Sequence, residues 1–82
     1  MSDALTDRVL RVIAATQRLP IESVTPGKSF EELGIDSMDG VNILFALESE
    51  FDISIPDEEA RGIQTVGAMI EGVRRLADAA PK

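Results

Sequence analysis

The chain has 82 residues, a formal net charge of −7, and neither cysteine nor histidine. This length suits a single domain over residues 1–82, with an ordered core over about residues 3–78. Because thiolate and imidazole groups are absent, we expect neither a catalytic site nor a metal site. The negative charge repels phosphates and disfavours nucleic-acid binding. No apolar run has membrane-spanning length and no signal-peptide pattern is present, so we expect a cytoplasmic monomer without a membrane span.

Apolar residues spaced three and four apart predict the first helix. It starts after Ser2 or Asp3, either of which suits an N-cap, and it ends before Pro20, because proline cannot extend a helix. Its inward face is formed by Leu5, Val9, Val12, Ile13 and Thr16.

A long connection follows, from about residue 19 to residue 36. Its apolar residues are irregularly spaced, so we expect them to fix the connection onto the core. Thr25-Pro26-Gly27 predicts a turn, and Gly34 suits a positive φ just before the next helix.

The second helix is predicted to begin at Ser37 and to end near Asp52, with Asp36 and Ser37 both of N-cap type. Its inward stripe is Val41, Leu44, Leu47 and Phe51. Met38 and Phe45 lie off this stripe. They either pack against the connection or form a small exposed apolar contact surrounded by acids.

The last two helices are short and long, respectively. Residues 57–61 follow Pro56 and precede Gly62, which suits a short helix. Thr65 can cap the final helix, before a frayed tail over residues 79–82. The inward face of that helix is Val66, Met69, Ile70, Val73 and Leu76 or Ala77. The predicted fold is all-α: a small four-helix bundle of three longer helices and one short third helix.

Acidic residues dominate the middle of the chain. Residues 29–60 contain ten acids and no lysine or arginine. Such a region is either a solvated acidic face or a docking surface for basic partners.

Ser37 is open to two interpretations. A serine at a helix start is usually a cap. No histidine can activate this one as a nucleophile, but another enzyme could use its hydroxyl as a passive acceptor. A helix N-terminus also suits an attached phosphodiester, because its free amides face the anion.

Three segments carry a family resemblance: Leu33-Gly34-Ile35-Asp36-Ser37-Met38-Asp39, Glu50-Phe51-Asp52-Ile53 and Ile55-Pro56-Asp57-Glu58-Glu59-Ala60. Together they resemble the acyl carrier protein family, which has a phosphopantetheine-binding carrier domain. The resemblance implies a non-catalytic carrier whose Ser37 receives 4′-phosphopantetheine from coenzyme A. The thiol of that arm would hold acyl groups as thioesters for fatty-acid, lipid or polyketide-type biosynthesis.

The resemblance also implies partners and their contacts. The partners would be a phosphopantetheinyl transferase and acyl-loading, ketosynthase-type and acyltransferase-type enzymes with basic docking surfaces. The implied partner contacts are Asp36, Met38, Asp39, Phe45 and Glu48. The implied acyl-pocket residues are Phe30, Leu47, Ile55, Ala60, Ile63, Ala68 and Met69.

The sequence departs at Gly40, Asn42 and Phe45 from the pattern of the housekeeping members of the family. These departures indicate a specialised carrier.

Three alternatives stay open. One is an aminoacyl or peptidyl carrier of a nonribosomal pathway. Another is an acidic interaction module in which Ser37 is only a cap. A third is a small carboxylate enzyme or a weak metal binder, although the acidic residues of this chain lack the spacing and the glycine of a calcium-binding loop.

If the chain is a carrier, we expect its apo and acylated forms to differ most over residues 55–63.

Overall fold

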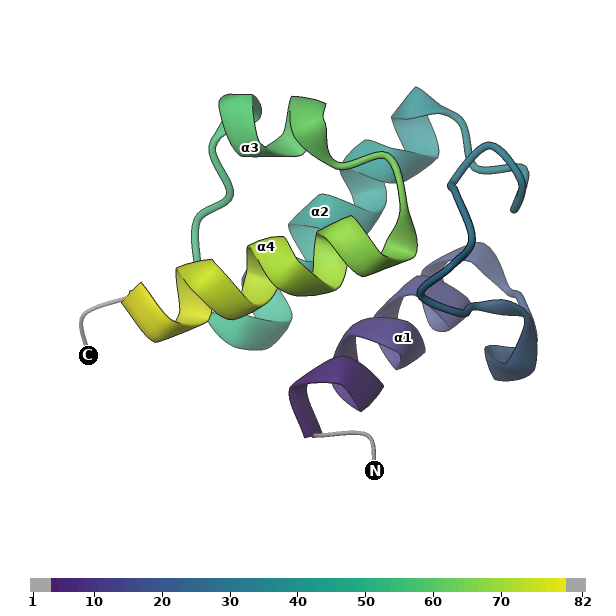
Figure 1. Cartoon of the computed structure of the whole chain (residues 1–82), viewed down its shortest axis with the longest axis horizontal. Helices are drawn as coiled ribbons and strands as arrows, with labels where there is room; N and C mark the ends of the chain where they lie inside the picture. Colours follow the sequence, from purple (N-terminus) through teal and green to yellow (C-terminus); the bar gives the residue numbers. More distant parts are fainter. Residues whose placement is uncertain (1–3, 80–82) are drawn as a thin grey trace.

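The computed structural model describes residues 4–79, which form a bundle of helices (Figure 1). The elements are α1 (Ala4–Gln17), the 3₁₀ turn η1 (Ile21–Ser23), α2 (Ser37–Phe51), α3 (Asp57–Gly62) and α4 (Val66–Ala79). Among the described residues the only β-type pairing is an isolated bridge between Ser29 and Thr65. The prediction of three longer helices and one short one is therefore confirmed. The predicted caps Ser2 and Asp3 and residues 80–82 of the predicted tail lie outside the described residues.

The core lies among α1, α2, α4 and the long connection. Its buried side chains are Val9, Ile13, Ala14, Val24, Ile35, Ile43, Leu47, Ile55, Val66, Met69, Ile70 and Val73. The predicted inward face of α4 is confirmed, because its first four members are all buried. In α1 the prediction was wrong for Thr16, which is exposed. The Thr16 hydroxyl donates to the Ile13 carbonyl at 3.1 Å, which satisfies it locally at the helix surface.

The inward face of α2 differs from the predicted stripe. Ile43 and Leu47, one turn apart, are fully buried, whereas Val41 is 47% exposed. Leu44 is only partly buried. Because α2 carries apolar residues on several sides, spacing alone did not determine which of them faces the core.

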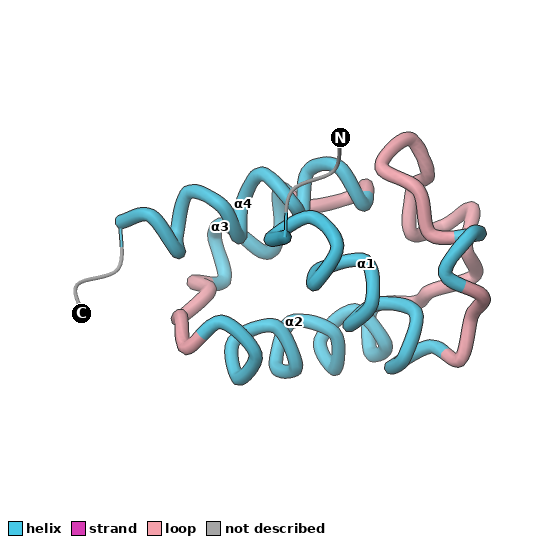
Figure 2. Tube along the Cα trace, turned by 90° about the horizontal axis from the view of Figure 1, so that it is seen from below, coloured by secondary structure: helices cyan, strands magenta, loops and turns pink. Residues whose placement is uncertain are grey.

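The connection between α1 and α2 is fixed to the bundle by buried side chains and by backbone hydrogen bonds. Val24 and Ile35 are buried. The first amides of α4 use the carbonyls of the connection: Val66 donates to Lys28 and Gly67 donates to Pro26, both at 3.0 Å. Figure 2 shows the loop segments of this connection (pink) gathered at one end of the bundle.

Two features of this connection agree with the sequence prediction. The amide of Lys28 donates to the Thr25 carbonyl at 3.1 Å, which closes the predicted turn. Gly34 has a φ of 75°, a value that a side chain would disfavour. The chain therefore turns sharply just before it enters α2.

Candidate functional site

Ser37 is the first residue of α2, and its hydroxyl is available. The N-cap is Asp36, whose Oδ1 accepts a hydrogen bond from the amide of Asp39 at 2.8 Å. Ser37 is exposed, and its side chain makes no hydrogen bond to any residue that the structure describes. The cap role that sequence left open between the two residues thus belongs to Asp36.

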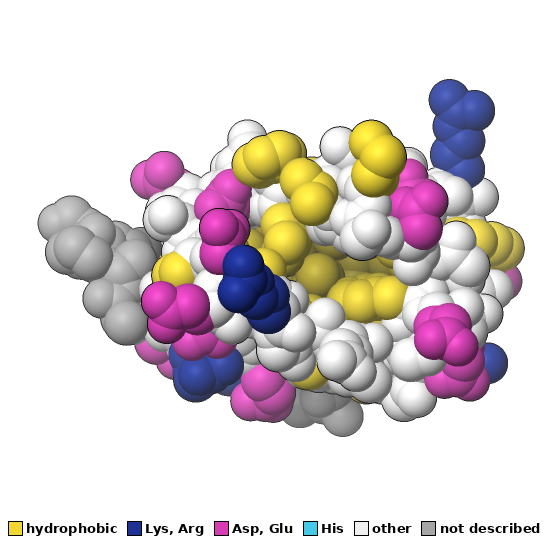
Figure 3. All heavy atoms as spheres, turned by 90° about the horizontal axis from the view of Figure 1, so that it is seen from above, with side chains coloured by type: hydrophobic (Ala, Val, Ile, Leu, Met, Phe, Trp, Pro, Cys, Tyr) yellow, Lys and Arg dark blue, Asp and Glu magenta, His cyan; other side chains and the backbone are white. Residues whose placement is uncertain are grey.

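A pocket of about 540 Å³, lined in part by Ser37, lies between α2, α3 and the connection. One wall follows the face of α2 that contains Ser37, Gly40, Val41 and Leu44. Figure 3 shows the molecule from above, with apolar side chains (yellow) lining a hollow between polar and charged ones. The pocket therefore offers a partly apolar site beside Ser37 to a flexible chain attached there.

The predicted pocket residues separate into three groups. Phe30, Ala60, Ile63 and Met69 line the pocket beside Ser37. Ala68 lines a second hollow, of about 490 Å³, between α3 and α4. Leu47 and Ile55 line neither hollow and belong to the buried core.

Sequence reasoning missed Val41, Leu44 and Ile35 as lining residues. A signal was present for two of them. Ser37, Val41 and Leu44 are spaced four and three apart, so they share one face of a helix that begins at Ser37. Ile35 carried no comparable signal, because its position depends on how the connection folds back.

The exposed side of α2 combines apolar and acidic side chains. Met38 is 77% exposed and Phe45 is 64% exposed, so neither packs mainly against the connection. Asp39 is partly buried and Asp36 is exposed. We call this surface, made of Asp36, Met38, Asp39, Val41 and Phe45, the α2 face.

Glu48, predicted as a partner contact, has an internal hydrogen-bonding role. Its Oε2 accepts from the amide of Ile55 at 2.7 Å, and its backbone carbonyl accepts from the amide of Ile53 at 3.1 Å. The residue therefore holds the chain as it leaves α2 for α3. Its role as a partner contact stays a prediction.

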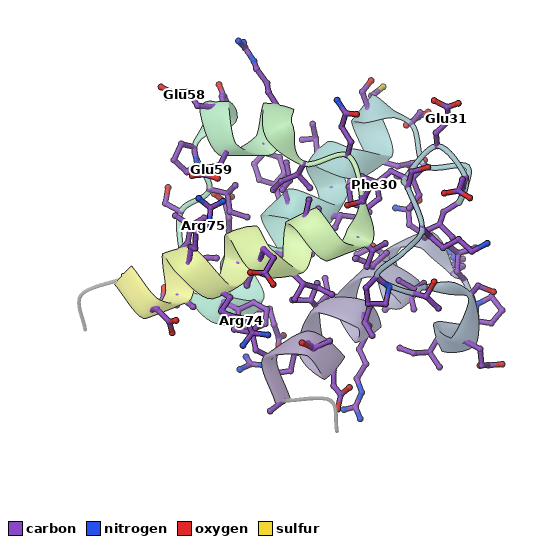
Figure 4. The ribbon with its side chains drawn as sticks, in the orientation of Figure 1. Phe30, Glu31, Glu58, Glu59, Arg74 and Arg75 are labelled. Carbon is purple, nitrogen blue, oxygen red and sulfur yellow. The ribbon has the colours of Figure 1, made fainter. Side chains whose placement is uncertain are left out.

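α3 is weakly attached to the rest of the fold. None of its six residues is buried. Figure 4 shows Glu59 and Arg75 meeting between α3 and α4, where Arg75 Nη2 lies 3.0 Å from Glu59 Oε2. Glu58 points away from this pair in the same view. The α3 wall of the pocket is thus attached through this ion pair, through the partly buried Ala60 and through the flanking apolar residues Ile55 and Ile63.

A tight turn precedes the site. The amide of Ser29 donates to Glu32 Oε1 at 2.9 Å, and the amide of Glu32 donates to Ser29 Oγ at 3.1 Å. The hydrogen bond from the Ser29 backbone, followed by that from the Ser29 side chain, lowers the pKa of Glu32. These bonds fix the segment that carries Phe30 into the pocket.

The described residues contain neither a candidate metal site nor a candidate membrane-spanning helix. No group of three acids among residues 4–79 could hold a metal ion. No helix in this part of the chain is both long enough and apolar enough to cross a membrane.

Comparison with known proteins matches the chain to one family and to many individual relatives. Residues 7–73 match the family described as a phosphopantetheine attachment site. The mitochondrial acyl carrier protein of Dictyostelium discoideum is 43% identical over 75 residues, which are 92% of this chain and 62% of that relative. The chain thus spans less than two thirds of the relative's length. This match contradicts the expected cytoplasmic location, because the relative is named as a mitochondrial protein.

Proposed function

Because this chain belongs to the phosphopantetheine attachment-site family, we propose that it is an acyl carrier protein that carries its arm on Ser37. The observation that supports this assignment best is the position of Ser37. The residue is exposed, is not used as a helix cap, and lines a pocket whose surface is mainly apolar. As a member of a carrier family, the chain is a non-catalytic protein on which other enzymes act.

The residues around Ser37 fit an attached 4′-phosphopantetheine. The phosphodiester would lie at the N-terminus of α2, where the helix dipole favours an anion. Attachment would form a bond from Ser37 Oγ to the pantetheine phosphorus as the pyrophosphate bond of coenzyme A breaks. The hydroxyl proton would pass to a base of the transferase, and 3′,5′-adenosine diphosphate would leave. When bound, the arm supplies the thiol that this cysteine-free chain lacks.

The apolar lining favours an acyl chain over an aminoacyl or peptidyl group, because burial of a polar group without partners is costly. Phe30, Ala60, Ile63 and Met69 would surround the chain, together with Val41 and Leu44. We therefore propose a role in fatty-acid-type synthesis. The name of the relative makes mitochondria the compartment to test for this chain.

Intact mass after incubation with coenzyme A, magnesium and a broad-range phosphopantetheinyl transferase tests the attachment site. We expect the mass of one phosphopantetheine to be added to the natural protein and to the variant Ser49→Ala. Ser49 is a matched control, because it is also an exposed serine of α2. Ser37→Ala should gain nothing. Modification of folded Ser37→Ala, or no modification of the folded natural protein, would reject Ser37 as the attachment site.

We further propose that the α2 face docks partner enzymes. Its exposed Met38 and Phe45 lie among acids, which suits a basic partner surface with an apolar centre. The transferase serves as the test partner. Its kcat/KM for the natural protein should fall as salt rises, because screening weakens attraction between exposed charges.

The variant Asp39→Asn should lower kcat/KM and flatten its salt dependence. Asp78→Asn is the control, because Asp78 is exposed on α4 away from the α2 face. An equal effect of both variants would indicate that net charge matters and that the α2 face does not.

A further inference from the structure

Among the residues that the structure describes, Arg61 is the only basic one that lines the pocket beside Ser37. It is exposed, and it makes no hydrogen bond or ion pair with the residues that the structure describes. Arg8 and Arg75, in contrast, are engaged in ion pairs with Glu50 and Glu59. The guanidinium of Arg61 is therefore available at the rim of the site that would hold the cargo.

The rest of the pocket is unfavourable for an anion. Glu31, Asp36 and Asp57 line the same pocket and repel negative charge. Its remaining wall is largely apolar, and transfer of a carboxylate into an apolar site is costly without a partner. A carboxylate on the arm would thus find attraction at Arg61 and repulsion or desolvation elsewhere in the pocket.

We propose that Arg61 recognises acyl groups that end in a carboxylate, and holds such cargo at the rim of the pocket. A guanidinium offers two parallel N–H donors, which match the two oxygens of a carboxylate. Uncharged acyl chains lack that group and enter the apolar interior. Arg61 thereby distinguishes dicarboxylic half-thioesters from simple acyl chains. This inference rests on the proposed carrier function.

The test follows the Nε–H of Arg61 by NMR in ¹⁵N-labelled protein, slightly below neutral pH. Four forms are compared: apo, holo with a free thiol, acetyl-loaded and malonyl-loaded. Loading uses the transferase with coenzyme A or the corresponding thioester, and intact mass verifies it. The signal of the Arg61 Nε–H is assigned by its absence from the spectrum of the Arg61→Gln variant. The Nε–H of Arg11 is the internal control, because Arg11 is exposed on α1 and does not line the pocket.

We expect exchange of the Arg61 Nε–H with water to be about two- to fivefold slower in the malonyl form than in the acetyl form, as for an exposed ion pair. Arg11 should be unchanged. Arg61→Lys should keep part of the interaction, visible as a shift of the malonyl carboxyl carbon relative to Arg61→Gln.

Three outcomes would overturn the proposal. Equal exchange in the acetyl and malonyl forms would show that Arg61 does not sense the carboxylate. Equal slowing in the holo, acetyl and malonyl forms would show that Arg61 binds the phosphodiester of the arm. Failure of the natural protein to gain any arm would reject the carrier function and this inference with it, and the mass alone distinguishes that case.

Discussion

Asp36 and Ser37 are adjacent and of similar capping ability, yet their side chains do different things. Asp36 Oδ1 accepts a hydrogen bond from the amide of Asp39, while the Ser37 hydroxyl has no hydrogen-bond partner within residues 4–79. A cap uses the lone pairs of its side-chain oxygen, so a capping serine would be less free to react. The division of roles therefore leaves Ser37 available for modification at little structural cost.

This division predicts different stabilities for two alanine variants. Asp36→Ala should lower the free energy of unfolding by about 0.5–2 kcal/mol, because a cap is lost. Ser37→Ala should change it by less than about 0.5 kcal/mol, as expected for an exposed residue without such a role. Urea unfolding followed by circular dichroism measures both. A loss in Ser37→Ala equal to that in Asp36→Ala would mean that the serine is the cap after all.

At the level of single residues, the sequence predicted the features that depend only on residues nearby in the chain. The cap at the start of α2, the turn at Pro26–Gly27 and the positive φ of Gly34 are local, and all three are present. The internal bond of Glu48 to Ile55 could not be predicted, because it depends on the path of the chain after α2.

Helix bounds were predictable for a similar reason. Proline, glycine and capping residues mark most helix ends, so α2 and α3 lie close to where the sequence places them. The inward face of α2 was not predictable. Ile43, Val41 and Leu44 are all apolar, and only the packing of the whole core makes Ile43 the buried one.

The short helix α3 depends on a contact that sequence does not reveal. Glu59 and Arg75 are 16 residues apart and join α3 to α4. Because both side chains are partly exposed, the pair contributes little to global stability, on the order of 0.2–1 kcal/mol. Its effect should be concentrated in the local opening of α3, which has no buried residue of its own.

We therefore expect Arg75→Gln to speed amide exchange within α3 by up to about fivefold, and to leave the slowest amides of α2 unchanged. Hydrogen–deuterium exchange at residue resolution measures this. Arg11→Gln removes an exposed arginine without an ion pair among the described residues and should leave α3 unaffected. If both variants behave alike, the Glu59–Arg75 pair does not hold α3.

At the scale of the whole molecule, contacts between distant segments assemble the bundle. Arg8 of α1 donates to the Glu50 side chain and carbonyl, 42 residues away, and its guanidinium lies 4.4 Å from the centre of the Phe51 ring. At the other end, an ideal Cβ on Gly67 would lie 2.9 Å from the Pro26 carbonyl oxygen, so glycine permits α4 to meet the connection. These contacts join α1 to α2 and α4 to the connection, and none of them includes α3.

This arrangement determines which part of the fold a bound acyl chain should stabilise. The pocket has walls from α2, α3 and the connection, but only α3 lacks buried residues. A chain that enters the pocket would bury apolar surface, worth about 0.8 kcal/mol for each CH₂ group. That free energy should have its largest effect on α3, because α3 is the wall that is least stable without the chain. Residues 55–63 should therefore show the largest protection on acylation.

Hydrogen–deuterium exchange of apo, acetyl-loaded and octanoyl-loaded protein tests this expectation. The octanoyl form should slow exchange over residues 55–63 more than the acetyl form does, because the longer chain buries more apolar surface. Ser37→Ala, which should not load, is the control for incubation alone. Equal exchange in the three forms over residues 55–63 would mean that the acyl chain stays outside the pocket. Protection spread evenly over all helices would instead mean that α3 is no weaker than the elements around it.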